Sequence, residues 1–119
     1  SWFSYRYGEL LYYNNRYAEA TIEYEDAVYN SYKPAAPAFI RLASIYLKNG
    51  NFIKAQKILE SLKQIAPDYY DTDYYLGVVF FHLKDYQKSL YWYKKFLTNC
   101  PENLKPDIYK IIKMIENKL

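Results

Sequence analysis

Apolar residues recur along the chain three or four positions apart, which is the spacing of amphipathic α-helices. Short polar turns divide these segments into pairs, and Pro67 and Pro101 close the second and third pairs. Each periodic segment has the length of an ordinary helix, so the pattern predicts an all-α chain. The predicted first helices of the pairs span 2–14, 36–48 and 70–83, and the second helices span 17–30, 52–65 and 86–98.

Small residues repeat with the same period as the helix pairs. Gly8, Ala43 and Gly77 lie 35 and 34 residues apart, and twelve positions after each comes another small residue. A period of about 34 residues indicates one helical hairpin per repeat, which buries its apolar face only by stacking on its neighbours. The predicted repeats span about 1–34, 36–69 and 70–103. The second small series is Ala20, Ala55 and Ser89, and larger apolar residues recur nearby, as at Tyr7, Leu42 and Leu76.

A fourth copy does not follow the third. Residues 105–119 instead predict a single helix, with Pro106 in its first turn. Its apolar residues form one stripe, and Lys110 and Lys113 face away from that stripe. Repeat arrays need terminal caps for solubility, so this segment is predicted to cover the last hairpin. The stripe consists of Ile108, Ile111, Ile112, Ile115 and Leu119.

Composition narrows the classes of protein that the chain can represent. With 119 residues, 51% of them apolar, it is predicted to form one domain over residues 1–119. The net charge of +3 is spread along the chain, without the basic stripe of nucleic-acid-binding proteins. The longest apolar stretch, 74–83, is too short to span a bilayer. We therefore expect no nucleic-acid partner and no transmembrane segment, and we expect a fragment of a longer protein because the first residues already lie within a repeat.

Catalysis and metal binding have little support in the sequence. His82 is the only histidine and Cys100 the only cysteine, so the chain offers no metal-ligand cluster and no internal disulfide. We expect no enzyme activity, catalytic residue, metal or cofactor, and interpret Cys100 as an incidental, half-buried thiol. The 17 tyrosines fit either an AT-rich genome or a binding surface, and their positions in the fold must distinguish the two.

The repeats carry a recognisable pattern of residues. They resemble the tetratricopeptide repeat, whose hairpins follow the pattern W-x₂-L-G-x₂-Y, then A-x₃-F, then P. The pentatricopeptide RNA-binding repeat has a similar period, but the small-residue signature and the nearly neutral charge disfavour it. The matching residues are Leu76, Gly77, Phe80, Ser89, Tyr93 and Pro101 in the third copy, and Leu42, Ala43, Tyr46, Ala55, Leu59 and Pro67 in the second.

The resemblance implies a right-handed superhelical array of three helix-turn-helix hairpins with a terminal capping helix. Two departures from the family pattern stand out. The usual tryptophan of the first helix is replaced by Ser4, Phe39 and Asp73. Phe96 stands where a small residue is usual late in the second helix, and we interpret it as filling space beside the single capping helix.

By resemblance, the first helices line a concave groove with repeat positions two, five, six, nine, twelve and thirteen. The best-known groove of the family clamps a terminal carboxylate through Lys and Asn. Here the clamp positions hold Tyr5, Glu9, Arg41, Asp71 and Tyr75, so most of the charge-assisted donors are missing and no such clamp is expected. The predicted groove residues are Tyr5, Arg6, Glu9, Tyr12, Tyr13, Ile40, Arg41, Ser44, Leu47, Lys48, Tyr74, Tyr75, Val78, Phe81 and His82, with Trp2, Pro37 and Asp71 at the first position of each set.

A groove of aromatic and aliphatic residues with two arginines has the composition of protein-interface hot spots. The predicted function is a protein–protein interaction or scaffolding module that binds an apolar or amphipathic peptide or helix. In this groove Arg41 is expected to select a carboxylate or backbone carbonyl of the ligand. Packing between neighbouring first helices is the alternative explanation for these side chains. The alternative functions are an accessory substrate-positioning domain of a larger enzyme and a homo-oligomerisation module.

Overall fold

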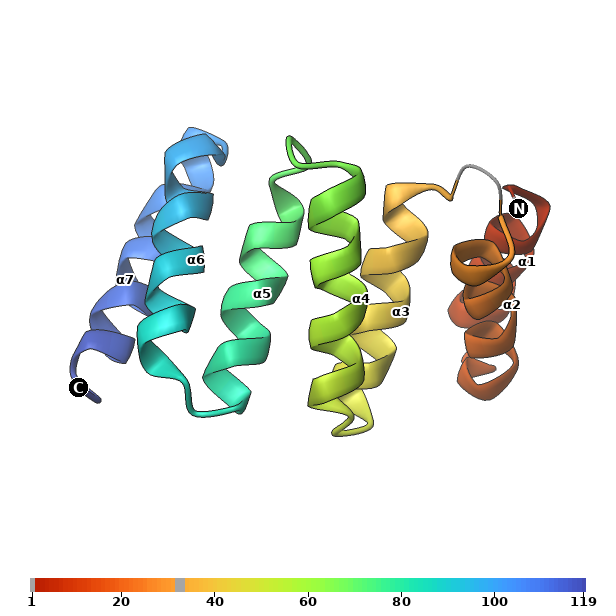
Figure 1. Ribbon diagram of the computed structural model, residues 1–119, viewed down its shortest axis with the longest axis horizontal. Coiled ribbons are helices and arrows are strands. Elements are labelled where there is room, and N and C mark those ends of the chain that lie inside the picture. The colour runs from red at the N-terminus through yellow and green to blue at the C-terminus, as the bar shows by residue number, and fades with distance from the viewer. Residues whose placement is uncertain (1, 32–33) are drawn as a thin grey trace. The chain divides into compact units, whose positions relative to one another are not determined.

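The computed structural model describes residues 2–31 and 34–119, and Figure 1 shows their course. Across these residues the chain forms seven α-helices and one 3-10 turn, with no strand, which confirms the all-α prediction. The helix bounds agree closely with those expected from periodicity, except that the last helix ends at Glu116. The elements are α1 (Trp2–Tyr13), α2 (Tyr17–Tyr29), α3 (Ala36–Lys48), α4 (Phe52–Ile65), α5 (Asp71–His82), α6 (Tyr86–Asn99), η1 (Glu102–Leu104) and α7 (Lys105–Glu116).

The helices gather into two compact units, an N-terminal unit (Ser1–Ile58) and a C-terminal unit (Leu59–Leu119). In the N-terminal unit α2 packs against both α1 and α3, and in the C-terminal unit α6 packs against both α5 and α7. Consecutive helices therefore pack in pairs, as expected of helical hairpins. The superhelical arrangement, the single domain and the repeat boundaries stay predictions.

The turns inside the three hairpins share one backbone conformation. Asn15 and Lys84 have a φ of 61° and Gly50 has a φ of 78°, which is the left-handed region. These residues occupy the same repeat position. In each turn the following N–H donates to the carbonyl five residues earlier, over 2.9 Å from Arg16 to Leu11, 2.8 Å from Asn51 to Tyr46 and 2.9 Å from Asp85 to Phe80. The first helix of each hairpin thus ends in a Schellman motif, which satisfies its last carbonyls.

Close helix contact inside the hairpins depends on the small residues, as the sequence predicted. A Cβ on Gly8 would lie 2.9 Å from the ring of Tyr24. The Ser89 hydroxyl donates a buried hydrogen bond of 2.7 Å to the Gly77 carbonyl, so this small residue also joins α6 to α5. Ala20, Ala55 and Ser89 are fully buried.

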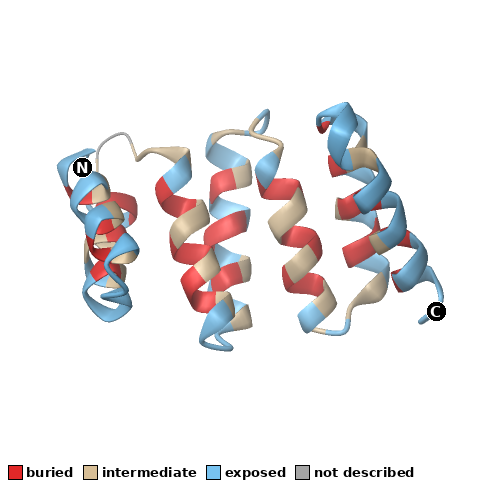
Figure 2. Cartoon of the chain, turned by 180° about the vertical axis from the view of Figure 1, so that it is seen from behind, coloured by how far each residue is buried: buried red, intermediate tan, exposed pale blue. Residues whose placement is uncertain are grey.

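The capping helix α7 completes the core of the C-terminal unit. Ile108, Ile112 and Ile115 of α7 are buried in one cluster with Phe96 and other residues of α6, as expected of a cap. Leu119 is an exception to the predicted stripe, because α7 ends before it and leaves it exposed. Figure 2 shows buried and exposed residues alternating along the helices of the chain.

Candidate partner-binding surfaces

The predicted groove residues are all at least partly accessible. None of the fifteen is buried, and Arg6, Tyr13, Lys48 and His82 are exposed. In each unit they come from the concave-facing positions predicted for α1, α3 and α5. The side chains of the two units are engaged in different ways.

In the N-terminal unit, an ion pair joins α1 to α3. The Arg41 Nε atom lies 2.9 Å from the Glu9 Oε1 atom, and both side chains are only partly exposed. The Arg41 guanidinium also donates to the Tyr13 hydroxyl and lies 4.8 Å from the centre of the Tyr12 ring. A ligand carboxylate at Arg41 would therefore have to compete with Glu9. This engagement could not be predicted from spacing alone.

Two tyrosines interact with the same carboxylate. Tyr24 is fully buried and donates a hydrogen bond to Glu9, and burial followed by this bond to an anion raises the pKa of Tyr24. Burial and the nearby Glu9 charge also raise the pKa of Tyr5. Lys48 approaches the Tyr12 hydroxyl at 3.3 Å. These tyrosines thus support the fold as well as the surface, which gives part of the tyrosine content a structural reason.

In the C-terminal unit, a cleft of about 330 Å³ lies beside α5 and α7, and we call it the α5–α7 cleft. Tyr74 and Tyr75, both predicted groove residues, lie in its wall. The Tyr74 ring packs 5.4 Å from that of Phe96 and 5.7 Å from that of Tyr93, so this tyrosine also anchors α5 to α6. The lining comprises Asp71, Tyr74, Tyr75, Phe96, Leu104, Asp107, Ile108 and Ile111.

Two other predicted residues of α5 pack inward more than expected. Val78 and Phe81 are half-buried against the cluster formed by α6 and α7, and the Phe81 ring lies 5.7 Å from that of Tyr86. Packing thus accounts for much of their surface, here against α6 and α7, whereas the alternative considered from the sequence was packing between neighbouring first helices. Sequence reasoning missed the contribution of α7 to the cleft, because it counted only the first helices of the repeats.

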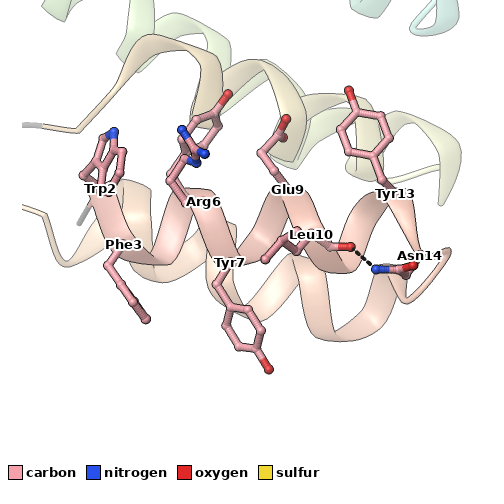
Figure 3. Close-up of a pocket in the computed structure, with 9 residues that line it drawn as sticks. Trp2, Phe3, Arg6, Tyr7, Glu9, Leu10, Tyr13 and Asn14 are labelled. Atoms are coloured by element: carbon pink, nitrogen blue, oxygen red, sulfur yellow. Dashed lines mark hydrogen bonds between the residues drawn. The ribbon is translucent and has the colours of Figure 1, made fainter.

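A third surface lies along α1 (Figure 3). This hollow of about 600 Å³ is lined by residues of α1 and the following Asn14. It includes the predicted groove residues Tyr5, Arg6, Glu9 and Tyr13, and the Arg6 guanidinium lies 5.1 Å from the centre of the Trp2 ring. Phe3, Tyr7 and Leu10 extend the hollow onto a face that the groove prediction left out.

The exposed face of α1 carries repeat positions that are buried elsewhere. Leu10 is 63% exposed, whereas Ile45 and Val79 at the same repeat position are 3% and 0% exposed. Tyr7 is 45% exposed, although Leu42 and Leu76, its counterparts, are fully buried. Tyr7 therefore does not share the buried environment of its counterparts in the other two copies. The three copies share a pattern, but their surroundings differ: in the N-terminal unit α2 packs against both α1 and the first helix of the next copy, α3.

The described residues include no group of three or more His, Cys, Asp or Glu side chains that could hold a metal ion. Cys100 is a free, buried thiol rather than a half-buried one. None of the helices built from residues 2–31 and 34–119 is long and apolar enough to cross a membrane.

A comparison with known protein families agrees with the repeat pattern. The family profile described as "Tetratricopeptide repeat" matches residues 40–103, more than half of the chain. The chain belongs to the tetratricopeptide repeat family. Tetratricopeptide repeats are protein-interaction modules, and this membership gives the chain a role in protein–protein interaction.

Two curated tetratricopeptide repeat proteins are similar to parts of the chain. It is 36% identical over 84 residues to "Cell division cycle protein 27 homolog A" from Arabidopsis thaliana, covering 71% of the chain and 12% of that protein. It is 30% identical over 96 residues to "Hsp70-Hsp90 organizing protein 1" from Glycine max, covering 81% of the chain and 17% of that protein. The chain thus spans less than a fifth of either relative.

Proposed function

We propose that this tetratricopeptide repeat chain is a non-catalytic module that binds an apolar or amphipathic peptide or helix against the exposed sides of its first helices. The observation that supports this most directly is the α5–α7 cleft. Its wall combines Tyr74 and Tyr75 with aliphatic side chains of α7. Clefts of this kind, mostly apolar with a few polar groups, are the usual sites for ligands.

The α5–α7 cleft is a better candidate than the Arg41 region for apolar recognition. Arg41 is held by Glu9 and two tyrosines, so part of its hydrogen-bonding capacity is already used within the chain. Tyr75 is half-buried and Leu104 is exposed beside an open volume. A ligand side chain entering the cleft would remove this apolar surface from water without breaking an ion pair.

Peptide display on the folded chain tests this function. We expect enrichment of peptides with aromatic or aliphatic residues, which lose roughly tenfold or more in affinity when Tyr75 is replaced by alanine. Tyr109→Ala is the matched control, because Tyr109 is an exposed tyrosine of α7 outside the cleft lining. If titration calorimetry gives equal peptide affinities for the two variants, the binding site does not include the cleft.

Self-association is a second candidate, favoured by the exposed face of α1. Phe3 and Leu10 are 74% and 63% exposed on that face, and exposed apolar patches commonly mark interfaces. A second copy covering this face would give a molar mass in light scattering that rises with concentration. Leu10→Gln would then abolish the rise, whereas a constant monomer mass would remove this candidate.

A further inference from the structure

We infer that the α5–α7 cleft selects a cationic side chain, Lys or Arg, within the peptide that the module binds. This inference rests on the proposed function and adds a charge preference to it. The lining contains two carboxylates, Asp71 and Asp107, and no basic residue. The remaining lining residues are aromatic or aliphatic, so the cleft joins an apolar wall to negative charge.

The two carboxylates are not used by the fold as ion-pair partners. Within the part of the chain that the structure describes, neither Asp71 nor Asp107 forms a salt bridge or a side-chain hydrogen bond. The neighbouring acidic residues behave differently, because Glu102 pairs with Lys105 at 2.8 Å and Glu116 with Lys94 at 3.7 Å. Lys105, the first residue of α7, is thus engaged by Glu102 rather than by Asp107, although the chain as a whole carries a charge of +3.

Helix stability explains only part of this arrangement. Asp71 lies in the first turn of α5 and Asp107 in the first turn of α7, where the helix dipole favours negative charge. A carboxylate in the first turn gains this stabilisation in any direction in which its side chain points into water. It does not require that both helices place their carboxylates around one shared apolar cleft.

A lysine or arginine side chain fits this combination of surfaces. Its methylene stem would cover the apolar wall at Ile111, and its charged end would reach the carboxylates. The rings of Tyr74 and Tyr75 add cation–π attraction to the same group. A glutamate would be repelled by both carboxylates, and a neutral side chain would strip water from them without replacing it.

The test uses four labelled peptides with one apolar sequence, differing only at a central residue that is lysine, arginine, norleucine or glutamate. Fluorescence anisotropy with the full chain should show the lysine and arginine peptides binding roughly fivefold to tenfold more tightly than the norleucine peptide, and the glutamate peptide most weakly. The difference should shrink in 1 M salt, where charges at an open site are screened. Equal affinities for lysine and norleucine peptides would overturn the charge preference while leaving the proposed function intact.

Isosteric variants locate the effect. Asp71→Asn combined with Asp107→Asn should abolish the preference for lysine and leave norleucine binding unchanged. Asp68→Asn is the matched control, because Asp68 is exposed in the same unit but outside the cleft lining. If the double variant keeps the preference, the cation binds elsewhere. If it fails to fold, the salt dependence of the unmodified chain decides.

A small probe separates the cleft from the rest of the peptide site. Hexylammonium alone should perturb the methyl resonances of Ile111 in NMR spectra, whereas hexanol should perturb them more weakly. Failure of every peptide to bind would overturn the proposed function, and the inference with it. Equal perturbation by both probes would overturn the inference alone.

Discussion

The ring of Tyr93 lies so close to Gly77 that a Cβ on this glycine would be 2.8 Å from two ring carbons. Tyr93 is buried and packs against Tyr74, so its ring has little room to move away. Gly8 and Tyr24 repeat this contact in the N-terminal unit. The distance between the helices of these hairpins is thus set by a glycine on one helix and a tyrosine on the other.

Gly77→Ala should therefore lower the free energy of unfolding, although alanine is the better helix former. We expect a net loss of about 1–2 kcal/mol, because overpacking in a filled core outweighs the gain in helix propensity. Urea melts followed by circular dichroism measure the change. Adding Tyr93→Leu should relieve the clash and recover part of the loss; a stabilised single variant would contradict the close packing.

The left-handed turn residues offer the opposite test. Lys84 has a φ of 61°, a conformation that costs a residue with a Cβ but not glycine. Lys84→Gly should raise the free energy of unfolding by about 0.5–1 kcal/mol, whereas Gly50→Ala should lower it by about 1 kcal/mol. Thermal melts of both variants provide the measurement. Loss of stability in Lys84→Gly would show that the lysine side chain has another role.

A nearly buried ion pair connects α4 to α5. The Lys63 Nζ atom lies 2.7 Å from the Asp73 carboxylate, and the Asp73 side chain is only 2% exposed. Lys63→Met should cost about 3 kcal/mol, because it leaves the aspartate buried without its partner. The double variant Lys63→Met with Asp73→Leu should recover most of that loss. Chemical denaturation of the three proteins tests this, and equal losses would mean that the pairing is unimportant.

Positions that share a place in the repeat should respond differently to a polar residue. Leu10→Gln should change the free energy of unfolding by less than about 0.5 kcal/mol, because Leu10 is already in water. Ile45→Gln should cost about 3 kcal/mol or more, because it buries an amide in an apolar site. Melting curves compare the two directly. Similar losses would show that the face of α1 is covered in solution.

The periodic pattern was enough to predict the helices, because each boundary depends on a few neighbouring residues. The close contact at Gly8 and Gly77 was also predictable, since small residues recur where helices approach. The pattern could not show that Tyr7 and Leu10 are exposed, because it treats every copy as equivalent. It could not show that Arg41 pairs with Glu9 either, since that depends on side-chain geometry between two helices.

The cleft was partly predictable for the same reason. Tyr74 and Tyr75 were expected on the open side of α5. Asp107 and Ile111 belong to a segment that was considered only as a cap, and Leu104 directly precedes that segment. Sequence spacing did not indicate that residues of α7 that pack on α6 would also line a cleft. The packing of α7 in the C-terminal unit shows that this helix both covers α6 and lines the cleft.

This double use of α7 couples the cleft to local unfolding. Ile108 belongs both to the buried cluster with α6 and to the lining of the cleft. Fraying of α7 would open the cleft and uncover α6 together, so a bound ligand would oppose both events. Amide hydrogen exchange in α7 should consequently slow in proportion to occupancy, and it would report binding without a label on either partner.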